Sequence, residues 1–181
     1  RHLMPWPAES ITPSMHRVMV EAVVTADIGP LRVMTTHLEY YSHQQRERQI
    51  DAIRRLHVEA CAMSARNLLI EEQGGAFETF PRPKQALLCG DLNFPAAAPE
   101  RMQILAPFTA GVPNFNDAWF VLHPGQVHAP TVGIHPVDFV DRPECFDYVF
   151  ITDGLVSHLK AHGIDATTEA SDHQPIWVEL A

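Results

Sequence analysis

Four short segments combine acidic, amide and imidazole side chains with apolar, strand-like neighbours. They are Thr36-His37-Leu38-Glu39, Gly90-Asp91-Leu92-Asn93, Phe146-Asp147-Tyr148 and Ser171-Asp172-His173-Gln174-Pro175. The first three stand at the C-terminal ends of predicted strands and the fourth precedes one, and strand ends are where a rigid scaffold presents side chains to a cleft. A lone Asp after Gly is usually a turn residue, and a lone Asp-His pair is usually incidental. The ordered appearance of all four segments instead predicts a shared catalytic site.

The first two segments need a hairpin and a helix to position them. Arg17 to Thr25 is rich in Val and Met and predicts a strand, the turn signal Asp27-Ile28-Gly29-Pro30 follows, and a second strand runs from Leu31 to about Thr36. Ser42 with Gln45 is a capping-box signature. Apolar residues then recur at helical spacing as far as Leu68, which predicts one long amphipathic helix ending before Gly74-Gly75.

The second half of the chain alternates short strands with loops. Gln85 to Cys89 predicts a strand, in which Cys89 is a buried thiol, and Arg101 to Leu105 predicts a short helix. His123 to Cys145 holds four prolines and little periodicity, so we expect a long surface loop. Further strands are expected at Phe146 to Thr152, Ile176 to Leu180 and somewhere between Leu155 and Ile164. The pattern predicts a single α+β domain over residues 1–181.

The ordered motifs resemble those of the endonuclease/exonuclease/phosphatase family, from about Arg17 to the C-terminus. Gly-Asp-Leu-Asn and Ser-Asp-His-x-Pro are the most specific of them, and Asp117-Ala118-Trp119, Arg46 and Gln49 also stand where the family has them. The resemblance implies a DNase I-like four-layer α/β/β/α sandwich. It also implies a divalent-metal-dependent hydrolase of phosphoesters, which could be a phosphodiesterase, a phosphatase or a nuclease.

The resemblance assigns a catalytic role to each matching residue. Asp91 resembles the carboxylate that orients or deprotonates the attacking water, and Asn93 resembles the amide that holds water or a phosphate oxygen. If the strand stays extended, their spacing puts both on one side. His173 resembles the histidine that stabilises the phosphoryl charge, and Asp147 the carboxylate that fixes its ring. His37 resembles the histidine that donates to the phosphate.

A metal ion is also implied by the resemblance. Asp172 resembles a ligand, directly or through water, and Asp91 and Asn93 complete the implied set. Carboxylate and amide oxygens suit a hard cation, so Mg²⁺ is expected, with Mn²⁺ as its substitute. Zinc fits poorly without cysteine ligands, and we expect exposed, unligated side chains for the loop histidines His123, His128 and His135.

The match begins midway through the family fold. Its members start with a strand leading to Asn, and a later strand ends in a Gln-Glu pair whose Glu is the principal metal ligand. Nothing before Arg17 supplies that Glu, because Glu9 sits in a Pro- and Ser-rich stretch. We therefore expect a fragment or, alternatively, a natural short form that has lost catalysis. In either case we expect this chain alone to bind metal weakly or not at all. Strands without their neighbours would expose edges, which favours self-association or a covering partner.

The composition of the chain limits the expected class of substrate and the expected location of the protein. A formal charge of -9 argues against long nucleic acids and slightly favours a small-molecule or lipid-headgroup phosphoester. Three widely spaced cysteines and the lack of an apolar run of roughly 20 residues fit a cytoplasmic protein. The alternative is a non-catalytic binding or scaffold domain that keeps the fold. Thr131 and His135 are expected to be exposed loop residues, and Trp119 and Phe120 to pack in the core.

Overall fold

The computed structural model describes residues 1–6, 12–67, 80–136 and 138–181. Its helices are α1 (His43–Asn67), α2 (Pro99–Leu105), α3 (Ala118–Leu122) and the 3₁₀ helix η2 (Asp153–His158). Its strands are β1 (His2–Leu3), β2 (Val18–Ala26), β3 (Gly29–Thr36), β4 (Ala86–Asp91), β5 (Phe115–Asp117), β6 (Asp147–Thr152), β7 (Leu159–Ile164) and β8 (Ile176–Leu180). No helix among these residues is long and apolar enough to cross a membrane.

Six strands form one mixed sheet in the order β1-β2-β3-β4-β6-β5, while β7 and β8 pair separately. The predicted β2-β3 hairpin is confirmed, and Gly29 supplies the positive φ of 101° that its tight turn needs. β3 and β4 are parallel, whereas β6 runs antiparallel to β4. Within the described residues β1 pairs with only Val18 and Met19 of β2, so the rest of that edge is open. Self-association through it stays a prediction.

The start of α1 follows the predicted cap in part. The backbone N–H of Gln45 donates to Ser42 Oγ at 3.1 Å, which satisfies one of the free amides of the first turn. The Gln45 side chain does not reach back to Ser42. Its Nε2 donates instead to Glu39 Oε2 and to Met15 O. The helix is described to Asn67, and its predicted continuation lies outside the described residues.

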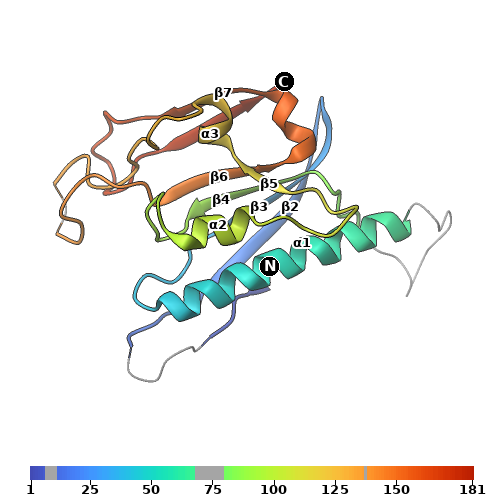
Figure 1. Ribbon diagram of the computed structural model, residues 1–181, viewed down its shortest axis with the longest axis horizontal. Coiled ribbons are helices and arrows are strands. Elements are labelled where there is room, and N and C mark those ends of the chain that lie inside the picture. The colour runs from blue at the N-terminus through green and yellow to red at the C-terminus, as the bar shows by residue number, and fades with distance from the viewer. Residues whose placement is uncertain (7–11, 68–79, 137) are drawn as a thin grey trace.

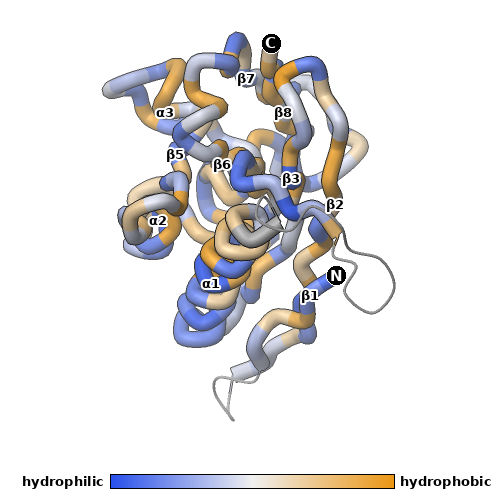
Figure 2. The backbone as a smooth tube through the Cα atoms, turned by 90° about the vertical axis from the view of Figure 1, so that its right-hand side faces the viewer, coloured by the Kyte–Doolittle hydropathy of each residue, from blue (hydrophilic) through white to orange (hydrophobic). Residues whose placement is uncertain are grey.

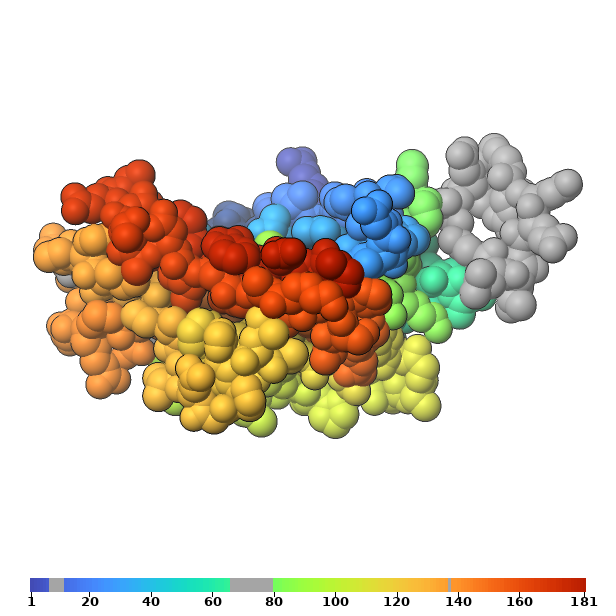
Figure 3. Space-filling view, turned by 90° about the horizontal axis from the view of Figure 1, so that it is seen from above, coloured from blue at the N-terminus to red at the C-terminus, as the bar shows by residue number. Residues whose placement is uncertain are grey.

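The six-stranded sheet has an apolar core on each face. Helices α1 and α2 pack on one face, and β7, β8, α3 and η2 cover part of the other (Figures 1 and 2). Met34, Ile50, Leu88 and Phe150 lie in the first core, and Leu31, Val149, Ile151 and Leu159 in the second. In Figure 3 the C-terminal strands, drawn in red, lie between α3 and the β2-β3 hairpin. The predicted α+β class is confirmed.

Two segments differ from the sequence prediction. The region predicted as one strand between Leu155 and Ile164 begins as η2 and becomes β7 only at Leu159. The predicted surface loop from His123 to Cys145 is partly a core segment. Val132 is fully buried and makes antiparallel bridges to both Glu144 and His173. The prolines end regular structure, but the loop still folds back onto the sheet.

Candidate active site

The predicted catalytic side chains meet where β4 ends and β6 begins. Asp91 and Asp147 are direct partners in the antiparallel β4-β6 register. Asp147 therefore opens its strand, and the prediction that it follows a strand end is wrong. Because β6 runs antiparallel to β4, the start of one strand lies beside the end of the other. The segment after β3 joins them, since Leu38 N donates to Asp91 O at 2.9 Å and places His37 beside Asp91.

A histidine, a carboxylate and a threonine form a chain of hydrogen bonds behind the cleft. His173 Nδ1 lies 2.8 Å from Asp147 Oδ2, and Thr131 Oγ1 donates to the same oxygen at 2.6 Å. Thr131 Oγ1 also accepts from the backbone N–H groups of Phe146 and Asp147, both at 3.1 Å. Asp147 is thus held on two sides and fixes the ring of His173.

Thr131 is a functional residue that sequence reasoning missed. We expected an exposed loop residue, but its side chain is completely buried. Its backbone explains the placement, because Gln174 N donates to Thr131 O at 2.7 Å and ties the loop to the segment that carries His173. Nothing in the local sequence pattern signals this contact, which is made only when residues far apart in the chain fold together.

The turn after β4 places Asn93. Its φ is 55°, its N–H donates to Asp91 Oδ1 at 2.9 Å, and its Nδ2 donates to Leu38 O at 2.8 Å. The expectation of an extended strand through Asn93 is therefore wrong, because the chain turns into the left-handed region there. Gly90 precedes the turn with φ 133°, and a Cβ at that position would lie 2.0 Å from Thr36 O. Only glycine fits where β4 approaches β3 so closely.

Burial and neighbouring charge shift the pKa values of the site. Burial, reinforced by the like charge of Asp147, raises the pKa of Asp91 to about 6. The hydrogen bond to Asp147 raises the pKa of His173, although burial opposes it. Burial lowers the pKa of His37, and the positive charges of Arg17 and His173 lower it further. His37 Nε2 and His173 Nε2 lie 3.2 and 3.8 Å from Asp91 Oδ2.

Three side chains could hold a metal ion in this region. Ligand atoms of Asp91, Asp147 and His173 all lie within 4.8 Å of one another. Burial and, after it, the facing carboxylate of Asp147 raise the pKa of Asp91, and a bound cation would offset the repulsion between the two carboxylates. Asp147 Oδ2 already accepts two hydrogen bonds, which suits an orienting role better than direct coordination. Asp172 is exposed and contacts Ser171, so it stands outside this group.

An open cleft of about 290 Å³ gives access to these groups. It is lined by Met15, Arg17, His37, Tyr40, Tyr41, Asp91, Asn93, Phe139 and His173. Asp147 lies behind His173 and does not line it. The cleft therefore brings together four of the predicted residues, namely His37, Asp91, Asn93 and His173.

Other residues of the matching motifs have structural roles. Gln49 Oε1 accepts from Glu39 N, and Arg46 Nη1 donates to the Glu39 and Tyr40 carbonyls, so both shape the loop after His37. Asp117 caps α3 by accepting from Trp119 N at 3.0 Å. We infer that Gln49 and Arg46 support the part of the cleft wall that the loop after His37 forms, whereas Asp117 caps α3.

The loop histidines are less exposed than predicted. His128 is only 6% exposed and His123 and His135 are partly buried, so the predicted exposure is wrong for all three. His128 Nδ1 donates to Ala129 O, and its Nε2 lies 3.7 Å from Cys145 Sγ. Cys145 is buried as well, whereas Cys89, predicted to be buried, is only partly buried. Among the described residues, none of these side chains belongs to a group that could hold a metal.

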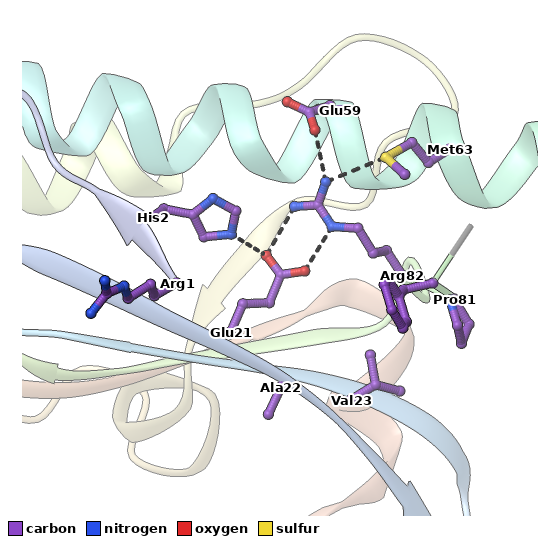
Figure 4. A pocket seen from close by; sticks show the side chains of 10 residues that line it. Arg1, His2, Glu21, Ala22, Val23, Glu59, Met63, Pro81 and Arg82 are labelled. Carbon is purple, nitrogen blue, oxygen red and sulfur yellow. Dashed lines mark hydrogen bonds and ion pairs between the residues drawn. The ribbon is translucent and has the colours of Figure 1, made fainter. Parts of the chain in front are cut away.

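A larger pocket of about 510 Å³ lies elsewhere, between β2 and α1 (Figure 4). Apart from Arg1, the charged groups that line it are paired with each other. Arg82 forms a two-pronged contact to Glu21 at 2.7 and 2.9 Å and a third to Glu59, and His2 also reaches Glu21. These pairs join β1, β2 and α1, so we interpret the pocket as a structural junction.

Comparison with solved structures identifies the fold of the chain. No protein-family model and no curated protein matches the chain. An endonuclease/exonuclease/phosphatase from Bacteroides vulgatus superposes with a TM-score of 0.59 at 18% identity, over 92% of this chain and 56% of that one. Humanized D. rerio TDP2 gives 0.58 at 16% identity, over 99% and 65%. The human Nocturnin catalytic domain with bound sulfate gives 0.57 at 15% identity, over 92% and 53%.

These likenesses confirm the DNase I-like fold that the motifs implied. The chain spans between 53% and 65% of the length of these three proteins. At such low identity the comparison establishes the fold, and the chemistry depends on the cleft itself.

Proposed function

Starting from the fold that the chain shares with endonuclease/exonuclease/phosphatase proteins, we propose that it hydrolyses phosphoesters with the help of a divalent cation. One observation carries the proposal. His37, Asp91, Asn93 and His173 come from three separate segments and converge on a single cleft. Such convergence of a base, an amide and imidazoles fits attack by water on an anionic phosphoryl group.

Asp91 is the proposed base. Without a bound cation its pKa is raised by burial to about 6, so the carboxylate is mostly ionised at neutral pH and basic enough to take a proton from an attacking water. Its Oδ1 accepts from Asn93 N, which fixes the carboxylate plane and leaves Oδ2 towards His37 and His173. Asn93 Nδ2 donates to Leu38 O, so the amide oxygen is the side-chain atom available to a ligand in the cleft.

His173 is the proposed partner of the phosphoryl charge. Asp147 accepts from its Nδ1 and thereby raises its pKa, so the ring carries a proton more readily at neutral pH. Nε2 then donates into the cleft. His37, whose pKa is lowered by burial, is a neutral donor to a second oxygen. Both rings would stabilise charge that develops in the transition state.

The residues present fit a hard cation. We assign Asp91 and the Asn93 amide oxygen as its contacts, with Asp172 reaching it only through water and Asp147 reserved for His173. When bound, Mg²⁺ or Mn²⁺ would neutralise charge on the phosphoryl oxygens. The formal charge of -9 favours a small-molecule or lipid-headgroup phosphoester over a long nucleic acid.

A substrate panel tests the proposal. Because metal binding by residues 1–181 alone is expected to be weak, the full-length protein, including any sequence upstream of Arg1, is assayed with bis-p-nitrophenyl phosphate, p-nitrophenyl phosphate and abasic DNA, each with Mg²⁺ or Mn²⁺. We expect metal-dependent turnover that Asp91→Asn lowers at least a hundredfold. Asp27→Asn makes the same change at the exposed β2-β3 turn and should retain wild-type rates. Equal rates for both variants would remove Asp91 from the mechanism, and inactivity throughout would favour a scaffold domain.

A further inference from the structure

Arg17 presents an unusual guanidinium to the cleft. It stands directly before β2 and lines the same cleft as His37, Asp91 and His173. Its Nε and Nη2 are buried and have no hydrogen-bond partner among the described residues. Buried nitrogen donors in native proteins are almost always bonded, so an unpaired pair of them on a cation requires an explanation.

Other buried or half-buried arginines of the chain are well bonded. Arg32 donates to Pro83 O at 3.2 Å, to Met34 Sδ and to His57 Nδ1. Arg82 is held by carboxylates, as Figure 4 shows. The fold thus provides acceptors for buried guanidinium groups elsewhere. At Arg17 it leaves the donors open on the wall of a cleft, where an incoming ligand can supply the acceptors.

The cleft indicates which ligand fits. Two neighbouring N–H groups in one plane match two oxygens of a phosphate group, which a guanidinium binds in a two-pronged manner. A volume of about 290 Å³ suits one phosphate and part of a small substituent. Asp91 and Asp147 repel an anion, so the fixed positive charge of Arg17 in the same cleft helps an anion to enter.

The rim of the cleft is aromatic. Tyr40, Tyr41 and Phe139 line it, and all three rings are at least 37% exposed. Phe139 lies nearly parallel to His173, with 17° between the ring planes and 6.3 Å between their centroids. A flat group attached to a phosphate held at His173 would therefore meet flat apolar surfaces.

We propose that Arg17 binds the phosphoryl group of the substrate, and that the cleft takes compact phosphate esters with a flat substituent packed on the aromatic rim. This inference rests on the proposed function, because it names the substrate class of the same cleft. It adds a substrate-binding residue outside the four motifs. It also implies that the open guanidinium is retained for binding at some cost to the fold, as functional groups often are.

Phosphate binding to the full chain tests the role of Arg17 without turnover. Isothermal titration with inorganic phosphate, with and without Mg²⁺, is compared for the wild type, Arg17→Met and Arg48→Met. Arg48 is an exposed residue of α1, so its variant is matched in charge and lies outside the cleft. We expect Arg17→Met to raise the Kd at least tenfold and Arg48→Met to leave it within twofold.

Thermal unfolding separates a binding role from a structural one. Removing an unpaired buried guanidinium should leave the Tm unchanged or raise it, whereas removing a structural arginine lowers it. Wild-type phosphate affinity in Arg17→Met, a lowered Tm, or a wild type that binds no phosphate would each overturn the assignment. If phosphate binds through Arg17 but no ester is hydrolysed, the proposed function fails while the binding assignment stands.

The substituent is tested with two esters. Phenyl phosphate should bind at least threefold more tightly than methyl phosphate, and Phe139→Ala should abolish that difference without changing the affinity for inorganic phosphate. Equal affinities of the wild type for the two esters would overturn the part of the inference that concerns the rim.

Discussion

Replacing Thr131 with valine should strongly destabilise the protein, although the two side chains are nearly the same size. Thr131 Oγ1 is completely buried and takes part in three hydrogen bonds. Valine removes all three. The backbone N–H groups of Phe146 and Asp147 then lose this partner inside the protein, and the Asp147 carboxylate loses one donor.

The magnitude follows from these groups. A buried donor left without its partner costs about 1–3 kcal/mol, and a hydrogen bond to a charged group contributes about 1.5–3 kcal/mol. Because the three groups share one oxygen and relax together, we expect a total loss of about 3–5 kcal/mol in the free energy of unfolding. That is a large part of the roughly 5–15 kcal/mol that stabilises a typical domain.

Thr131→Ser provides the matched control. It keeps the oxygen and removes one methyl group, which should cost about 1 kcal/mol. Urea unfolding followed by tryptophan fluorescence gives both values. If Thr131→Val lies within about 1 kcal/mol of Thr131→Ser, the hydroxyl does not hold Asp147 and the proposed support for His173 is wrong.

Two further predictions concern stability. His57 accepts from Arg32 at Nδ1 and bonds Pro113 O through Nε2, and burial lowers its pKa to about 4. Between about pH 6.5 and 4 the unfolded chain binds a proton at this residue that the folded chain does not. The free energy of unfolding should therefore fall by about 2 kcal/mol between pH 7 and 5 because of His57. Urea unfolding at both pH values checks this, and the same pH dependence in His57→Gln as in the wild type would contradict it. Gly90→Ala should be more destabilising than Gly29→Ala. Both positions have a positive φ, which costs a non-glycine residue about 1–3 kcal/mol, but only at Gly90 would the new Cβ also clash with backbone atoms. Equal Tm values for the two variants would refute the close approach of β4 to β3.

Local signals account for the elements that sequence could predict. The β2-β3 hairpin has a turn with glycine, α1 has a cap and a regular apolar face, and β4 and β6 are short apolar runs. Each is encoded within about 25 residues of chain. The motif residues Asp91, Asn93 and His173 were found for a different reason, because their order resembles a known family.

The remaining site residues depend on tertiary contacts. Arg17 reaches the cleft only because β2 pairs with β3, and Thr131 only because its loop bridges to the segment of His173. The position of Asp147 at the start of its strand depends on β6 running antiparallel to β4, and the spacing of residues in the sequence does not encode strand direction. Prolines correctly indicated an irregular segment, yet burial within it is set by what the segment packs against.

Phosphorus NMR of a single sample tests the central claim most directly. The full-length protein, including any sequence upstream of Arg1, is mixed with the most reactive ester of the panel, and the signals of ester and product are followed before Mg²⁺ is added, after it is added, and again after EDTA. We expect product to form only after Mg²⁺ is added and before EDTA chelates it, and no product to form with Asp91→Asn. Product formation that continues in EDTA, or that persists in Asp91→Asn, would contradict a cation-assisted hydrolysis at this cleft.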